Sequence, residues 1–159
     1  MRRMLIGSTA AACALALVTA GGAFARAGDR TAAETYPVAS ALCANARNNV
    51  LPPRLTAAKT QVLTACDTLL NAYGQLVATV DGAESTLLGT LSTQKALVAA
   101  ACTRPVKNAA ACQAARATAI SVDNSARTTE VAAGTAFHTA VEANRNTFWT
   151  TIQSLRSAA

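Results

Sequence analysis

Four cysteines beyond residue 25 are the side chains best suited to chemistry: Cys43, Cys66, Cys102 and Cys112. They form neither the CxxC motif of redox proteins nor the CxxCH motif that attaches haem. A structural zinc site would need several converging Cys or His ligands, and the sequence contains a single histidine. An even number of cysteines is instead typical of disulfides in an exported chain, and the N-terminus, described below, predicts export. We therefore expect two disulfides.

The single histidine, His138, is the next candidate. In a hairpin of two long helices it would lie within about one turn of Tyr73, next to Val141. Histidine and tyrosine are both axial ligands of haem iron, so these three residues define a candidate pocket for haem or another hydrophobic ligand. A lone histidine in a helix seam is more often a packing residue, and the favoured interpretation has no cofactor and no metal.

Catalytic machinery is not evident. Asp81 and Glu84 would share a helix face, but two carboxylates at that spacing are typical of a solvated surface. Nucleophilic catalysis needs an oriented base and a shaped cleft, and the P-loop, GxGxxG and HExxH motifs are absent. We therefore expect no catalytic residues and a protein that is not an enzyme.

The N-terminus predicts export. Arg2 and Arg3 precede an uncharged apolar stretch, and Ala23-Phe24-Ala25 has the small-x-small pattern that signal peptidase cleaves. We interpret residues 1–25 as a secretory signal peptide and the mature chain as secreted, periplasmic or attached to the cell envelope. Without Arg2 and Arg3 the net charge of +6 becomes +4, and no later segment is long and apolar enough to cross a bilayer.

The remaining chain is expected to be a single all-α domain, residues 37–159. Residues 26–36 are small and polar and predict a disordered lead-in. Pro37 suits the first turn of a short helix that ends near Arg47, because the following Asn48-Asn49 tolerates a left-handed cap.

Two longer helices should follow. Pro52-Pro53 starts the second helix and Thr103-Arg104-Pro105 stops it, because the residue before a proline is pushed out of helical conformation. Asn108 can cap the third helix, which continues to the C-terminus.

Apolar residues at alternating spacings of three and four mark a seam on each long helix. The first seam comprises Val62, Cys66, Leu69, Tyr73, Leu76, Val80, Ala83 and Leu87. The second comprises Val131, Gly134, His138, Val141, Arg145, Phe148, Ile152 and Leu155. Because the connection is short, we expect a long antiparallel hairpin. Gly74, Gly82 and Gly89 leave an alternative open, a folded-back bundle of four or five shorter helices.

Hairpin geometry predicts the disulfide pairing. Cys102 and Cys112 are equally far from the centre of the connection near Lys107, so we expect them to bond to each other. Cys66 then remains for Cys43, and that disulfide would tie the short first helix to the second.

The far part of a two-helix hairpin cannot cover all of its apolar residues. We therefore expect a candidate interface at Leu87, Leu88, Leu91, Leu97 and Val98, because exposed apolar patches mark sites of association. A candidate basic tip comprises Lys95, Arg104, Lys107 and Arg116, which suits an acidic polymer, anionic headgroups or an acidic protein. The basic residues are not interleaved with aromatics, which argues against nucleic acid.

These features favour an exported helical protein that acts through protein–protein contacts, either as a homo-oligomer or with an extracellular or envelope partner. The alternative is a carrier of a hydrophobic ligand such as haem, held between the helices at Tyr73, His138 and Val141.

Overall fold

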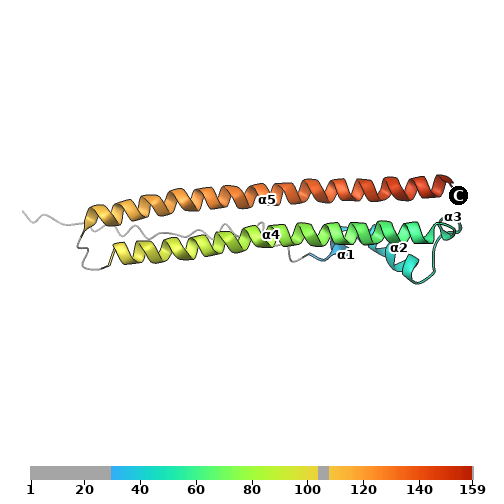
Figure 1. The fold of residues 1–159 in the computed structure, drawn as a ribbon, viewed down its shortest axis with the longest axis horizontal. Coiled ribbons are helices and arrows are strands. Elements are labelled where there is room, and N and C mark those ends of the chain that lie inside the picture. The colour runs from blue at the N-terminus through green and yellow to red at the C-terminus, as the bar shows by residue number, and fades with distance from the viewer. Residues whose placement is uncertain (1–29, 104–107, 159) are drawn as a thin grey trace, which may run out of the picture.

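The computed structural model describes residues 30–103 and 108–158, and it shows a long antiparallel helical hairpin with short helices packed at one end (Figure 1). The helices are α1 (Ala32–Thr35), α2 (Pro37–Arg47), α3 (Pro53–Thr56), α4 (Lys59–Ala101) and α5 (Ala109–Ala158). The described residues contain no strand. The expected all-α hairpin is therefore confirmed.

The two long helices are unbroken, so the folded-back bundle is excluded. Their 43 and 50 residues correspond to roughly 65 and 75 Å of helix. Neither contains a proline, and the hydroxyls of Thr86 and Thr93 donate to the carbonyls of Gly82 and Gly89, one turn earlier. Glycine weakens a helix by only about 1 kcal/mol, which continuous packing against a neighbouring helix outweighs.

The helix ends follow the local rules. Pro37 is the first residue of α2, and Asn49 beyond its end has a φ of 61°, the left-handed conformation that asparagine tolerates. The Asn108 side chain accepts a hydrogen bond of 3.0 Å from the Ala111 N–H and so caps α5 as expected. Pro53 starts only the one-turn helix α3, and α4 begins at Lys59.

We expected a disordered lead-in over residues 26–36; residues 26–29 lie outside the described residues, and the described part, 30–36, is ordered. Thr31 caps α1, and the Thr31 backbone N–H and hydroxyl donate to the Glu34 carboxylate at 2.7 and 2.9 Å. These bonds, the backbone one first, hold the pKa of the Glu34 carboxyl below its usual value. The Thr31-x-x-Glu34 capping box starts the helix and delivers Tyr36 to the core, where it is only 2 % exposed.

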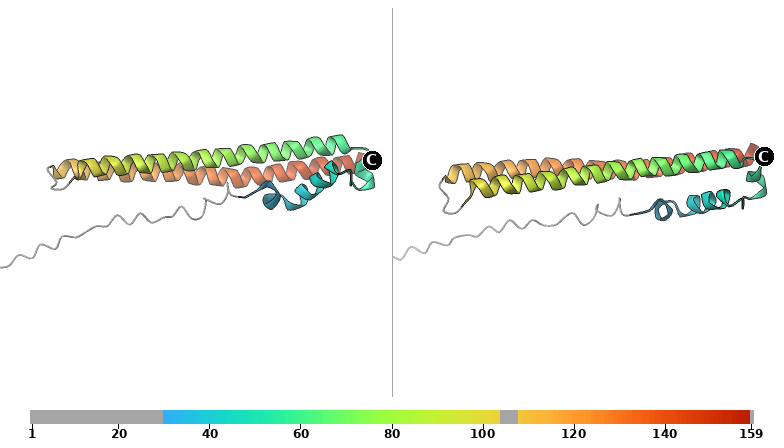
Figure 2. Two further views of the ribbon diagram at one scale, coloured as in Figure 1. Left: turned by 90° about the horizontal axis from the view of Figure 1, so that it is seen from below. Right: turned by 60° about the horizontal axis from the view of Figure 1, so that its bottom comes forward.

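The core lies at the end of the hairpin where α1, α2 and α3 pack, which we call the base (Figure 2). There a third layer covers one side of α4 and α5. The buried residues of this cluster are Tyr36, Ala39, Cys43, Ala46, Leu55, Val62, Cys66, Leu69, Tyr73, Val80, Phe137, Phe148 and Ile152. Four aromatic residues, Tyr36, Tyr73, Phe137 and Phe148, are thus gathered in one place.

The seam of α5 differs from the expectation at alternate positions. Phe137 is buried where His138 was expected, and His138 and Arg145 are exposed. As expected, the seam includes Gly134, Val141 and Phe148, which are buried or half-buried against α4. Phe137 is selected because its ring packs edge-on against that of Tyr73, with centroids 6.1 Å apart.

Both disulfides form as expected. Cys43 and Cys66 join α2 to α4 with their Cα atoms 5.7 Å apart, and Cys102 and Cys112 close the far end of the hairpin at 4.9 Å. Loops of 23 and 10 residues correspond to about 3 kcal/mol of stabilisation each in the chain-entropy model. That contribution is large for long helices that are rich in alanine and threonine, because these side chains bury little area each.

Candidate functional site in the distal half of the hairpin

The distal half of the hairpin consists of residues 78–101 of α4 and residues 109–133 of α5. The layer of short helices stops before it, since the Tyr73 hydroxyl donates to the Arg30 carbonyl at the start of that layer. Beyond this level, only α4 and α5 are present among the described residues (Figure 2). Two helices alone can each bury only one stripe of side chains.

Exposed apolar residues are concentrated in this half. Among the described residues, four of the six large exposed hydrophobics lie there: Leu88 at 59 %, Leu97 at 54 %, Ile120 at 56 % and Val131 at 47 %. Ile120 and Val131 are eleven residues apart, about three turns, so they share one face of α5. Such a concentration is typical of an association surface.

The expected interface set divides into three groups. Leu87 was wrongly included, because it is 6 % exposed and packs inside the hairpin. Leu91 and Val98 are half-buried at the edge of the seam. Leu88 and Leu97 are both exposed, but nine residues are about two and a half turns, so they lie on opposite faces of α4.

The face that contains Leu88 also points in the direction of the α2 layer. Cys66 marks that direction, because it is bonded to Cys43 of α2. Glu84 lies eighteen residues after Cys66, about five full turns, and therefore leaves α4 in the same direction. Leu88 and Leu91 follow Glu84 at spacings of four and three and lie on the same face.

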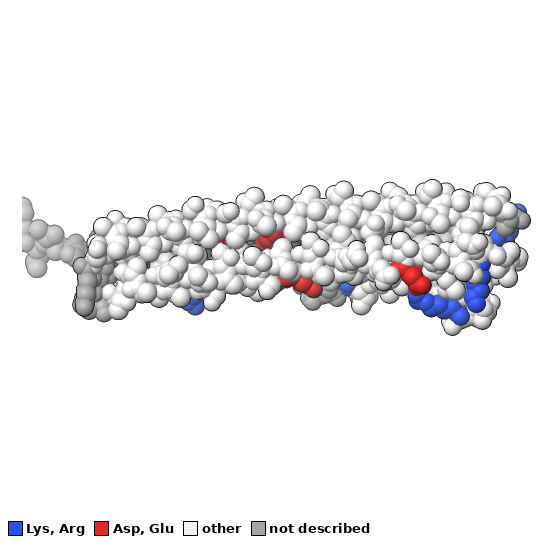
Figure 3. All heavy atoms as spheres, viewed as in Figure 1, with Lys and Arg blue, Asp and Glu red and all other residues white. Residues whose placement is uncertain are grey.

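Basic residues are present at the tip but also at the opposite end. Lys95 and Arg116 are exposed in the distal half, whereas Arg104 and Lys107 lie outside the described residues. Figure 3 shows a second group of basic side chains at the base, where Arg47, Arg54, Lys59 and Arg156 lie. The sequence reasoning missed this group because its members are far apart in the chain.

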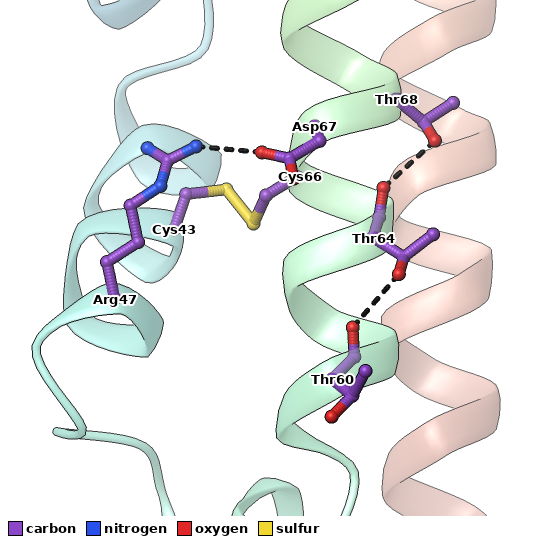
Figure 4. Close-up of polar contacts among 7 residues, drawn as sticks. All are labelled: Cys43, Arg47, Thr60, Thr64, Cys66, Asp67 and Thr68. Atoms are coloured by element: carbon purple, nitrogen blue, oxygen red, sulfur yellow. Dashed lines mark hydrogen bonds and ion pairs between the residues drawn. A yellow bond between two sulfur atoms is a disulfide. The ribbon is translucent and has the colours of Figure 1, made fainter.

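The basic group at the base is partly neutralised. Arg47 forms an ion pair of 2.9 Å with Asp67 (Figure 4), and both side chains are about half exposed or more. Lys59 donates to the side-chain oxygen of Asn49. Arg54 and Arg156 line a polar groove of about 660 Å³ between α3 and the end of α5.

A second groove, of about 540 Å³, runs between α4 and α5 at the base. Its apolar floor includes Leu69, Phe148 and Leu155, and threonines of both helices form its walls. Figure 4 shows that Thr60, Thr64 and Thr68 lie on the α5 side of α4, away from the disulfide to α2.

Three of the five threonine hydroxyls in this groove donate within their own helix. Thr64 and Thr68 donate to the carbonyls of Thr60 and Thr64 at 3.0 and 2.9 Å, and Thr151 donates to Thr147 at 3.0 Å. Because these three hydroxyl protons are used within their own helices, the three hydroxyls offer oxygen acceptors rather than free donors.

The residues expected to hold haem are not brought together. Tyr73 is buried, and its hydroxyl lies between the Arg30 carbonyl and the Thr35 hydroxyl. His138 is exposed and packs edge-on against Phe137, with ring centroids 5.7 Å apart. The Val141 carbonyl accepts a hydrogen bond of 3.3 Å from the Tyr36 hydroxyl. Packing within the chain therefore occupies this region.

Burial raises the pKa of the Tyr36 phenol, and the neighbouring Tyr73 adds to that effect. The described residues include no group of three or more His, Cys, Asp or Glu side chains that could hold a metal ion. Within the same residues, no helix is long and apolar enough to span a membrane.

Comparison with known proteins adds no relative. No protein-family model matches the sequence, and neither the curated proteins nor the solved structures include a significant match. The function must therefore be argued from the site itself.

Proposed function

We propose that this chain is an exported helical protein that acts through protein–protein contacts of the distal half of its hairpin, and that the contact is self-association. The observation that carries the proposal is the exposure of Leu88, at 59 %, on the face of α4 that α2 covers at the base. A third layer stabilises the base, and an associating chain would supply the equivalent layer beyond it.

The two disulfides support the exported location. Disulfides persist in oxidising compartments. This fold has two of them, one at the base and one at the tip. Residues 1–25 lie outside the described residues, and our interpretation of them as a signal peptide from the sequence agrees with such a compartment. Secretion to the medium, the periplasm or the cell envelope would each provide it.

The test is sedimentation velocity on the exported, oxidised chain over a wide range of protein concentration. We expect the wild-type chain to form a dimer or larger species. Leu88→Glu should shift it to monomer, because a carboxylate cannot be buried unpaired in an apolar contact.

Leu97→Glu is the matched control, since it makes the same change on the opposite face of the same helix at a nearly equal exposure of 54 %. It should associate like the wild type, and circular dichroism should show unchanged helix content in both variants. A wild-type chain that remains monomeric throughout would refute the proposal. Equal loss of association in the two variants would refute the role of the Leu88 face.

A further inference from the structure

A symmetrical arrangement of residues on α4 specifies how two copies would meet. We define the α4 stripe as Glu84, Leu88, Leu91 and Lys95, which follow one another at spacings of four, three and four. Residues at these spacings lie along one face of a helix. Relative to Cys66, this is the face that points to the α2 layer at the base.

The α4 stripe is complementary to an antiparallel copy of itself, both in charge and in the placement of its leucines. Its two leucines are equally far from the midpoint between residues 89 and 90, and so are Glu84 and Lys95. When two such helices are placed antiparallel about that midpoint, Leu88 lies opposite Leu91 of the second copy, and Glu84 lies opposite Lys95 of the second copy. A twofold axis produces each contact twice.

We infer that the distal half binds a second copy of this chain, with the two α4 stripes packed antiparallel about the midpoint between residues 89 and 90. This inference rests on the proposed function and specifies its geometry. Leu88 and Leu91 form the apolar centre, and two Glu84–Lys95 ion pairs flank it. Neither Glu84 nor Lys95 forms an ion pair with any described residue of its own chain.

The part of α4 that the short helices do not cover is long enough for such an overlap. From residue 78 to residue 101 the helix is roughly 35 Å long, and two adjacent helices present a face about 20 Å wide. The overlap would cover roughly 700 Å² on each copy, close to the ~800 Å² per partner of a standard stable interface. The tip of each copy would reach the level where the α1–α2 layer of the other begins.

Charge reversal at the two ends of the stripe tests the register. In the antiparallel pair, Glu84→Lys places two lysines together, and Lys95→Glu places two glutamates together, each at two symmetrical sites. We expect each single variant to weaken dimerisation by about tenfold, and the double variant Glu84→Lys/Lys95→Glu to restore wild-type affinity.

This set of variants separates contacts between copies from effects of net charge and from interactions within one chain. The two single changes alter net charge in opposite directions, so a shared weakening cannot come from overall repulsion between chains. Within one chain the two residues are eleven apart, about 16 Å, beyond the screening length of roughly 10 Å at 0.1 M salt. Rescue in the double variant must therefore arise between copies. Arg156→Glu, a reversal at the base, should leave the affinity unchanged.

Each outcome of the sedimentation equilibrium measurement has a definite meaning. Weakening by both single variants with rescue by the double variant supports the antiparallel register. A dimer that is lost in Leu88→Glu but is insensitive to the single charge reversals, as a parallel pair would be, overturns the register and leaves the proposed function standing. A monomeric wild-type chain overturns both.

Discussion

Phe137 and His138 are adjacent residues with opposite expected roles, and substituting each by alanine tests the packing of the hairpin. Phe137 is 5 % exposed and packs against the ring of Tyr73, whereas His138 is exposed. Phe→Ala in a core costs about 3–5 kcal/mol, and the lower value applies where neighbouring helices can collapse into the cavity. We expect Phe137→Ala to lower the free energy of unfolding by about 3 kcal/mol. The exposed His138→Ala should lower it by under about 0.5 kcal/mol.

The assay is equilibrium unfolding in urea, followed by circular dichroism with both disulfides intact. For a chain of this size, about 3 kcal/mol corresponds to a fall of roughly 10 °C in Tm, which thermal unfolding would confirm independently. Equal losses in the two variants, or a greater loss in His138→Ala, would show that the imidazole faces α4. Either result would refute the seam in which Phe137 packs against Tyr73.

Two other predictions concern helix propensity and pH. Gly82→Ala and Gly89→Ala should each raise the free energy of unfolding by about 1 kcal/mol, because an added Cβ would meet nothing within 4 Å at either position; lower stability in urea would contradict this. The raised pKa of Tyr36 stabilises the fold fully below the ordinary value of 10.0, and this contribution is lost as the pH rises through the higher folded-state pKa. Tyr36→Phe should therefore lose less stability than the wild type between neutral pH and alkaline pH, and identical pH profiles would be inconsistent with the burial argument.

The sequence was sufficient to predict the hairpin and its disulfides because these depend on few interactions. The absence of proline between Lys59 and Ala101 permits one long helix, and the short connection forces the two helices to be antiparallel. Pairing of Cys102 with Cys112 then follows from their equal distance to the connection, and Cys43 is left for Cys66.

The register of α5 could not be fixed in the same way. Gly134, Val141 and Phe148 belong to the seam in either register, and the position between them can be three or four residues after Gly134. Both choices satisfy the heptad pattern. The decision depends on the fit of Phe137 against Tyr73, which is a contact between helices and leaves no periodic signal in one sequence.

The α1 segment was missed for a different reason. Its composition is typical of a disordered terminus, but Thr31 and Glu34 are spaced as a capping box, and this local signal outweighs composition. Tyr36 follows directly and enters the core, so the helix is held by packing as well as by its cap. The same layer ends before the α4 stripe begins, and that boundary could be located only from the structure.

The placement of the second disulfide connects the fold to the proposed association. At the base, aromatic and aliphatic side chains of α2, α4 and α5 form a shared core. Towards the tip the seam of α4 contains Thr90 and Gln94, which are only half-buried, and the bond between Cys102 and Cys112 holds the helix ends together. A half that buries little apolar area by itself gains the most from a second copy, and its resistance to local opening should then increase as the concentration of the chain rises. Hydrogen exchange in the distal half should therefore slow as protein concentration rises, while exchange at the base stays constant.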